Sequence, residues 1–150
     1  MVVRWSVFLM GPAATGKTTV YQTLCKAECD EGRKTTYVDI NPKVVSTADL
    51  YGYMLPSKDW REGLLSKTMK NMSENPDLSP KWIVLDGDLD TNWIESMNSV
   101  MDNNRLLTLG NNDRIKLKEH MWMIFEIRDL IWASAATVSR AGILFISEGV

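Results

Sequence analysis

The sequence predicts an α/β fold in which a mostly parallel, five-stranded sheet is flanked by helices. Three observations carry this prediction. Short apolar runs alternate with longer amphipathic segments along the chain, an order that is typical of parallel sheets. The run at residues 82–85 is continuously apolar, which suits a strand buried on both faces. The 150 residues are enough for one domain core and too few for two.

The N-terminal half begins with a strand and a helix. Residues 5–10 are apolar and β-prone and stop at a Gly-Pro pair, which predicts a strand that ends in a turn. A helix is expected over residues 16–29, because an acidic turn with a glycine closes it. Residues 35–40 form the next expected strand, ended by an Asn-Pro pair. Apolar side chains at helical spacing predict a second helix over residues 59–72.

The C-terminal half alternates in the same way. The apolar run 82–85 is followed by a helical pattern over residues 93–101. Two β-prone segments between Leu106 and Leu117 flank a polar turn that contains Gly110, and together they predict a β-hairpin. The last expected elements are a buried strand, a short helix and a final strand at residues 121–125, 134–140 and 143–146.

Composition excludes several classes of function. Apolar residues make up 45% of the chain and charged residues 24%, as in ordinary globular proteins. The formal net charge of -2 gives no reason to expect nucleic acid or an anionic membrane as a partner. No apolar run reaches the roughly 18 residues that a bilayer crossing needs, and no signal peptide is recognisable.

Cysteine and lysine side chains are expected to have ordinary roles. Cys25 and Cys29 are predicted to be reduced thiols on a helix, because the single histidine, His120, is too far away in sequence to complete a zinc site with them. Reduced thiols fit a cytoplasmic protein. Three lysines are expected to lie in solvent: Lys67, Lys70 and Lys81.

The turn after the first strand carries a complete phosphate-binding motif, G-x-x-x-x-G-K-[ST]. Backbone N–H groups and the positive end of the helix dipole would hold phosphates. Lys17 would reach the β- and γ-phosphates, and the Thr18 hydroxyl would coordinate Mg²⁺. A chance glycine-rich turn is the alternative, but the strand before it and the helix after it favour a P-loop that binds ATP. The expected nucleotide contacts in this segment are Gly11, Pro12, Ala13, Ala14, Thr15, Gly16, Lys17, Thr18 and Thr19.

A second acidic site follows the buried run 82–85. Asp86 would stand at the carboxyl edge of the sheet, where ligands of such sheets bind, and would hold Mg²⁺ together with Thr18. The alternative is an acidic residue that merely opens a turn. Many ATPases of this architecture have a glutamate next, which activates water, but Gly87 has no side chain to accept a proton. Asp88 could face the same side as Asp86 and is the alternative base.

Four further stretches are distinctive. They are INPK with LYG, KWIVLDGD, WIESMNSVMD and ATVSRAG, at residues 40–43 with 50–52, 81–88, 93–102 and 136–142. Together they resemble the dynein heavy chain, and within it the second AAA+ module of the motor ring. The first module would show a glutamate after its Walker B aspartate, which Gly87 excludes.

The resemblance implies a fold and a role. Residues 1–150 would be the large α/β subdomain of an AAA+ module, with the hairpin inserted before the sensor strand and the small helical subdomain lying outside this chain. The module would belong to the ring of a minus-end-directed microtubule motor. It would bind ATP and Mg²⁺ without hydrolysing the nucleotide itself. A free-standing active ATPase with Asp88 as base is the alternative, and a segment that no longer binds nucleotide is another.

Two further site residues follow from the resemblance. Arg140 would be an arginine finger that acts on nucleotide in the neighbouring module, although the residues alone indicate a solvated cation at a helix end. Glu126 stands where AAA+ modules often have a polar sensor residue beside the nucleotide. Its carboxylate would repel a γ-phosphate, so it is expected to pair with a cation such as Arg128, to be protonated or to point away; a role as base is a further alternative.

The resemblance also implies partners and a location. Neighbouring AAA+ modules of the same heavy chain would contact this module. Intermediate chains, light chains and microtubules would bind through the rest of the heavy chain, with no nucleic acid and no membrane. The expected location is the cytoplasm and its cytoskeleton. The ending at residues 141–144 favours a ciliary or flagellar axoneme, and a cytoplasmic dynein stays open.

Overall fold

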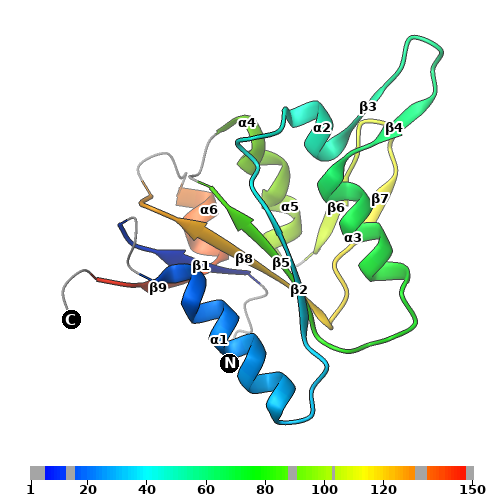
Figure 1. The fold of residues 1–150 in the computed structure, drawn as a ribbon. Coiled ribbons are helices and arrows are strands. Elements are labelled where there is room, and N and C mark those ends of the chain that lie inside the picture. Colours follow the sequence, from blue (N-terminus) through cyan, green and yellow to red (C-terminus); the bar gives the residue numbers. More distant parts are fainter. Residues whose placement is uncertain (1–5, 13–15, 88–90, 103, 131–134, 148–150) are drawn as a thin grey trace.

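A five-stranded sheet forms the centre of the molecule (Figure 1). The structure is a computed structural model and describes residues 6–12, 16–87, 91–102, 104–130 and 135–147. The strand order is β2-β5-β8-β1-β9, and every neighbouring pair is parallel. The prediction of a five-stranded, mostly parallel sheet is therefore confirmed. Its strands are β1 (Ser6–Met10), β2 (Thr36–Ile40), β5 (Lys81–Asp86), β8 (Met121–Ile127) and β9 (Gly142–Phe145).

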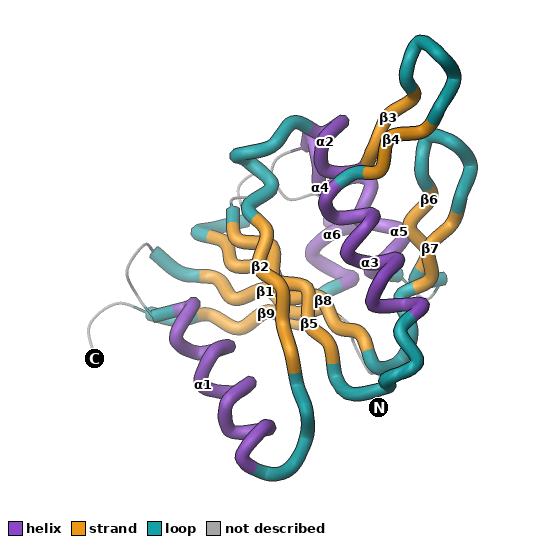
Figure 2. Tube along the Cα trace, turned by 45° about the vertical axis from the view of Figure 1, so that its right-hand side comes forward, coloured by secondary structure: helices purple, strands orange, loops and turns teal. Residues whose placement is uncertain are grey.

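Helices cover both faces of the sheet (Figure 2). Alternate side chains of the strands enter two separate apolar clusters, as the period of a strand requires. Val84 packs with Tyr21 and Cys25 of one helix, whereas Ile83 and Leu85 pack with the other helices. Burial on both faces explains the continuous apolar runs in the sequence. The helices are α1 (Lys17–Asp30) on the first face, and α2 (Thr47–Tyr51), α3 (Leu64–Glu74), α4 (Thr91–Ile94), α5 (Asn98–Met101) and α6 (Ala135–Arg140) on the second.

The prediction of a single helix over residues 59–72 was partly wrong. Strand β4 (Trp60–Glu62) occupies its start and pairs antiparallel with β3 (Gly52–Met54), and only α3 is helical. Gly52 has a φ of 100°, which suits glycine, and a Cβ there would lie 2.5 Å from the Trp60 ring. This close approach fixes Trp60 in the hairpin, although its spacing to Leu64 fits a helix. Neither α2 nor the β3–β4 hairpin was predicted.

The remaining elements follow the predictions closely. The helical pattern 93–101 is α4, a 3-10 turn at Glu95–Met97 and α5. The predicted hairpin is β6 (Leu106–Thr108) paired antiparallel with β7 (Arg114–Lys116). Strand β8 continues to Ile127, two residues beyond the predicted end, so Glu126 lies within the strand. No helix in the described part of the chain has the length and apolar character that a bilayer crossing requires.

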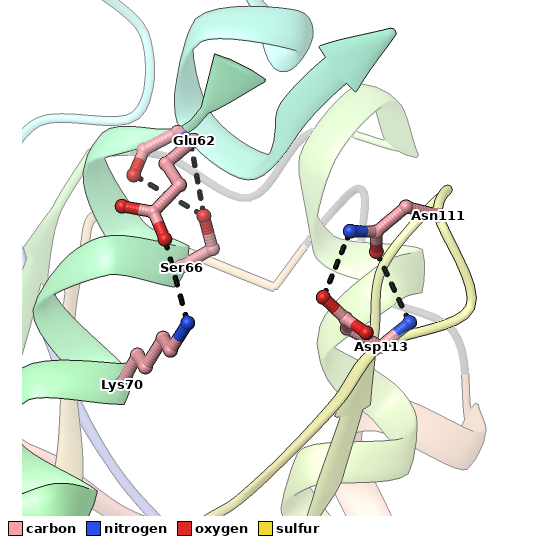
Figure 3. Close-up of polar contacts among 6 residues, drawn as sticks. Glu62, Ser66, Lys70, Asn111 and Asp113 are labelled. Atoms are coloured by element: carbon pink, nitrogen blue, oxygen red, sulfur yellow. Dashed lines mark hydrogen bonds and ion pairs between the residues drawn. The ribbon is translucent and has the colours of Figure 1, made fainter. Parts of the chain in front are cut away.

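Of the three lysines expected to lie in solvent, the prediction was wrong for one and confirmed for two. Lys81 is buried instead of solvated, because its ammonium donates hydrogen bonds to the carbonyls of Asp77 and Ser79 at 2.6 and 3.1 Å. Lys67 and Lys70 are exposed, and Figure 3 shows the ion pair of Lys70 with Glu62. The two cysteines are free thiols; both donate to the Thr35 carbonyl, at 3.4 Å from Cys25 and 3.3 Å from Cys29.

Candidate functional site

The carboxyl ends of three central strands meet at one edge of the sheet. Because the strands are parallel, the residues that follow them gather there. The Gly11 N–H after β1 donates to the Ile127 carbonyl at 3.2 Å, and the Gly87 N–H after β5 donates to the Glu126 carbonyl at 3.1 Å. These hydrogen bonds tie the turn after β1 and the turn after β5 to the end of β8, between them.

The phosphate loop runs from β1 into α1. Gly16 caps α1 in the left-handed region, with φ 87° and ψ 19°. A Cβ at this position would meet nothing within 4 Å, so it is the backbone conformation and not crowding that favours glycine here. The first-turn N–H groups of α1 are free of intrahelical partners by geometry and can bind an anion. The predicted contacts Ala13, Ala14 and Thr15 lie outside the described residues.

The Lys17 ammonium lies against the loop that precedes it. The residue is 9% exposed, and Nζ donates to the carbonyls of Gly11 at 2.6 Å and Pro12 at 2.8 Å. An ammonium has three protons to donate, so these two bonds do not exhaust it. Lys17 is therefore held where a phosphate bound by the loop would meet its positive charge. Thr19, in the same first turn, is exposed.

Thr18 and Glu126 form the contact that joins α1 to β8. The Thr18 hydroxyl donates to Glu126 Oε1 at 2.6 Å, so the alternative that Glu126 points away from the site is wrong. Glu126 is 8% exposed, and its second oxygen, Oε2, is buried with no hydrogen-bond partner among the described residues. Burial raises the pKa of Glu126, and the Thr18 hydrogen bond opposes that rise.

Asp86 is the exposed last residue of β5 and pairs in register with Glu126. Burial and the negative charges of both carboxylates raise the pKa of Tyr21 in α1. Burial, followed by the charges of Glu126, Asp39 and Asp86 among others, raises the pKa of Tyr21 to about 12. Acidic side chains from β2, β5 and β8 thus make this edge of the sheet electronegative, next to a loop that is built to take anions.

The position after Asp86 is crowded as well as lacking a side chain. A Cβ at Gly87 would lie 3.2 Å from Asn41 Oδ1 and 3.3 Å from Pro42 Cδ. Asn41 is held in turn, because its Oδ1 accepts a hydrogen bond from the Lys43 N–H at 3.0 Å. A larger residue at position 87 would therefore require Asn41 and Pro42 to shift by a few tenths of an ångström. The alternative base, Asp88, lies outside the described residues.

Arg140 is the last residue of α6, and its side chain lies outside what the structure describes. In the sequence, Asn41 and Pro42 mark a strand end and belong to a stretch that carries the resemblance. Their contact with position 87 could not be predicted, because it requires the β2–β5 register, in which Ile40 faces Leu85. Tyr21 was also missed; its place four residues after Lys17 on the same helix face could have indicated it.

The residues present fit a nucleotide with Mg²⁺. The Thr18 proton is directed at Glu126, so the lone pairs of the hydroxyl oxygen are left for a cation. The exposed Asp86 carboxylate and the unpaired Oε2 of Glu126 are further oxygen atoms of the kind that Mg²⁺ prefers. In the described part of the chain no group of three or more His, Cys, Asp or Glu residues could hold a metal ion. Phosphate oxygens would complete such a shell, as is usual for Mg²⁺ sites.

Comparison with known proteins identifies the family. Residues 6–141 match the AAA domain of the dynein-related subfamily. The chain is 52% identical over 147 residues to the dynein beta chain of the flagellar outer arm of Chlamydomonas reinhardtii, covering 97% of this chain and 3% of that protein. It is 50% identical over 163 residues to the alpha chain of the same arm, covering 99% of this chain and 4% of that protein.

A human relative gives the same picture. Dynein axonemal heavy chain 17 of Homo sapiens is 47% identical over 146 residues, which cover 97% of this chain and 3% of that protein. The chain thus spans only 3 or 4% of the length of these relatives. The family match extends over the phosphate loop, Asp86 and Glu126, and the parallel five-stranded sheet flanked by helices has the architecture that the resemblance implied. The chain therefore belongs to the dynein-related subfamily of AAA domains.

Proposed function

We propose that this chain is the large subdomain of the second AAA+ module of a dynein heavy chain, where it holds ATP with Mg²⁺ and hydrolyses little or none of it. The observation that carries the proposal is the combination of a complete phosphate loop with the crowded Gly87. In support of binding, Lys17 and Thr18 lie at the phosphate loop with hydrogen-bonded side chains, whereas position 87 has no proton acceptor and a Cβ added there would lie tightly against Asn41 and Pro42.

Each residue has a definite task in this proposal. The loop N–H groups and Lys17 bind the phosphates, and Thr18 and Asp86 hold Mg²⁺, which neutralises phosphate charge. Glu126 holds the Thr18 hydroxyl. Arg140 acts on nucleotide in the neighbouring module, and its place at the end of α6, in the segment that resembles an arginine-finger motif, supports this role.

The proposed setting follows from the relatives. Their names describe flagellar, ciliary and axonemal dynein chains. By similarity, this module is part of a cytoskeletal motor ring in a cilium or flagellum, with other AAA+ modules beside it and a small helical subdomain completing it. Intermediate chains, light chains and microtubules would bind through other parts of the heavy chain.

A direct experiment tests whether the chain holds ATP without hydrolysing it. The chain is incubated with Mg-ATP, free nucleotide is removed, and the retained nucleotide is identified by chromatography. ATP is the expected species. Retained ADP with released phosphate would overturn the non-hydrolysing assignment and point to Asp88 as base, which an Asp88→Asn variant would then check. A protein that retains nothing, and whose melting temperature Mg-ATP does not raise, would contradict nucleotide binding itself.

Introducing the missing glutamate is expected not to restore turnover. In Gly87→Glu the new side chain must push against Asn41 and Pro42, at 3.2 and 3.3 Å from its Cβ. Overpacking of this kind typically costs about 1–3 kcal/mol, so the free energy of unfolding measured in urea should fall by that amount. Gly110→Glu is the control, since its Cβ meets the Trp60 ring at an ordinary 3.4 Å. Rapid ADP production at unchanged stability would show that crowding at position 87 is no barrier.

A further inference from the structure

Glu126 is a buried carboxylate next to the phosphate loop. Its Oε1 accepts the Thr18 hydroxyl proton at 2.6 Å, and Thr18 follows the phosphate-binding lysine directly in sequence. Its register partner on β5 is Asp86, so two acidic residues lie side by side near the carboxyl ends of neighbouring strands. The charge of Lys17 also acts on Glu126, but the Lys17 ammonium donates to the carbonyls of Gly11 and Pro12. Among the described residues, Glu126 thus receives a hydrogen bond from a hydroxyl and forms no ion pair with Lys17.

Asp86 and Glu126 differ in how strongly their charges can interact with a bound nucleotide. Asp86 is exposed, so water and salt weaken its field. Glu126 is 8% exposed, and charges that are taken out of water interact much more strongly. A nucleotide without a metal ion would place its phosphate charge close to this weakly screened carboxylate. The same carboxylate would attract a divalent cation that sits at the Thr18 oxygen.

The second oxygen of Glu126 is a separate observation that points to a ligand at this site. Oε2 is buried and accepts no hydrogen bond from any described residue, and a buried polar atom without a partner is costly. A metal ion beside Thr18, or a water molecule bound to that ion, would satisfy it. The sign of the Glu126 contribution therefore depends on the metal: unfavourable to nucleotide alone and favourable to the nucleotide with its cation.

We propose that Glu126 is a positioning residue that makes nucleotide binding at this site depend on the divalent cation. It opposes metal-free ATP by its charge, and it favours Mg-ATP because the same charge attracts the cation at the Thr18 hydroxyl, whose lone pairs the hydrogen bond turns toward the metal. This inference rests on the proposed function and deepens it. In the proposed holding module it gives a physical reason for retention, because the nucleotide and the cation would have to leave together.

The test compares ATP affinity with and without the metal. Binding of ATP is measured by titration calorimetry in Mg²⁺ and in EDTA, for the wild-type chain and for Glu126→Gln. The amide keeps the size of the side chain and can still accept the Thr18 proton, but it removes the charge. Coupling between two bound ligands is commonly 5–150-fold. We expect the variant to bind metal-free ATP about tenfold tighter and Mg-ATP about tenfold weaker.

Opposite changes of ATP affinity in Mg²⁺ and in EDTA distinguish this role of Glu126 from a purely structural one. A variant that only loosens the contact between α1 and β8 would weaken both affinities together, and that result would overturn the proposal. Equal affinities of the wild-type chain in Mg²⁺ and in EDTA would overturn it as well. A wild-type chain that binds nucleotide in neither medium would contradict the proposed function itself, so the two failures are distinguishable.

Two controls complete the design. Glu119→Gln makes the same change at an exposed residue just before the amino end of β8, and it should alter neither affinity. If Glu126 acts through the hydroxyl, Glu126→Gln should no longer weaken Mg-ATP binding in a Thr18→Val background, as a double-mutant cycle would reveal. A Glu126 effect on Mg-ATP that is unchanged in that background would show that Thr18 does not transmit it.

Discussion

Replacing Lys17 with alanine is expected to weaken Mg-ATP binding by about 100-fold or more. Lys17 is only 9% exposed and its ammonium lies against the phosphate loop, so its interaction with phosphate would be weakly screened. A hydrogen bond to a charged group contributes about 1.5–3 kcal/mol, and a lysine can make more than one to the phosphates. A 100-fold loss corresponds to about 2.7 kcal/mol. Titration calorimetry with Mg-ATP measures the change directly.

A matched control is available on the same helix. Lys26→Ala makes the same substitution at an exposed position of α1, far along the helix from the loop, and its affinity for Mg-ATP should match that of the wild type. Lys17→Ala also removes the hydrogen bonds to the Gly11 and Pro12 carbonyls, so its melting temperature without nucleotide must be compared. A folded Lys17→Ala variant that binds Mg-ATP as tightly as the wild type would show that the motif is not the binding site.

The sequence was a good guide to the fold where local patterns and burial agree. Apolar runs such as residues 82–85 predict strands buried on both faces, and the sheet has them there. The failure over residues 59–72 has a specific cause. Trp60 and Leu64 stand at helical spacing, but β4 ends at Glu62 and α3 begins only at Leu64, and Trp60 packs over Gly52 in a hairpin. Such a contact depends on tertiary structure and leaves no periodic signal.

The site was predictable only as far as each motif determines its own geometry. The phosphate motif places Lys17 and Thr18, and the apolar run before Asp86 places that residue at the edge of the sheet. The hydrogen bond from Thr18 to Glu126 spans 108 positions of sequence, and it requires α1 to pack where β5 and β8 end. The sequence therefore identified Glu126 as unusual without revealing its partner.

The contact of Asn41 and Pro42 with position 87 shows the same limit. In the sequence, the glycine after Asp86 indicates only that the usual catalytic side chain is missing. The structure adds that the turn after β2 lies over this position, because β2 pairs with β5 in a register that brings Ile40 beside Leu85. In the proposed function, the absence of a glutamate and the tight contact at its position would both oppose hydrolysis, and only the first is visible in the sequence.

Replacing Gly63 with alanine is expected to lower the free energy of unfolding by about 3 kcal/mol or more, because a clash with backbone cannot be relieved by a rotamer change. A Cβ at Gly63 would lie 2.3 Å from the Gly52 nitrogen and 2.4 Å from the Leu50 carbonyl oxygen. Both belong to the junction between α2 and β3, where Leu50 is fully buried. The Gly63 N–H also donates to Ser66 Oγ at 3.0 Å, so the start of α3 cannot simply move away. Unfolding in urea measures the loss.

Gly110→Ala is the control for this effect, since its Cβ would meet the Trp60 ring at 3.4 Å and should change stability by less than about 1 kcal/mol. Equal urea midpoints for Gly63→Ala and the wild type would show that the junction yields easily. The expected result would link this junction to the site. Residues 43–46 connect the turn of Asn41 and Pro42 to α2, so we expect a backbone shift at Gly63 to be passed through α2 to the turn over Gly87. A Gly63→Ala chain that still folds should therefore tolerate glutamate at position 87 with a smaller further loss of stability than the wild type does.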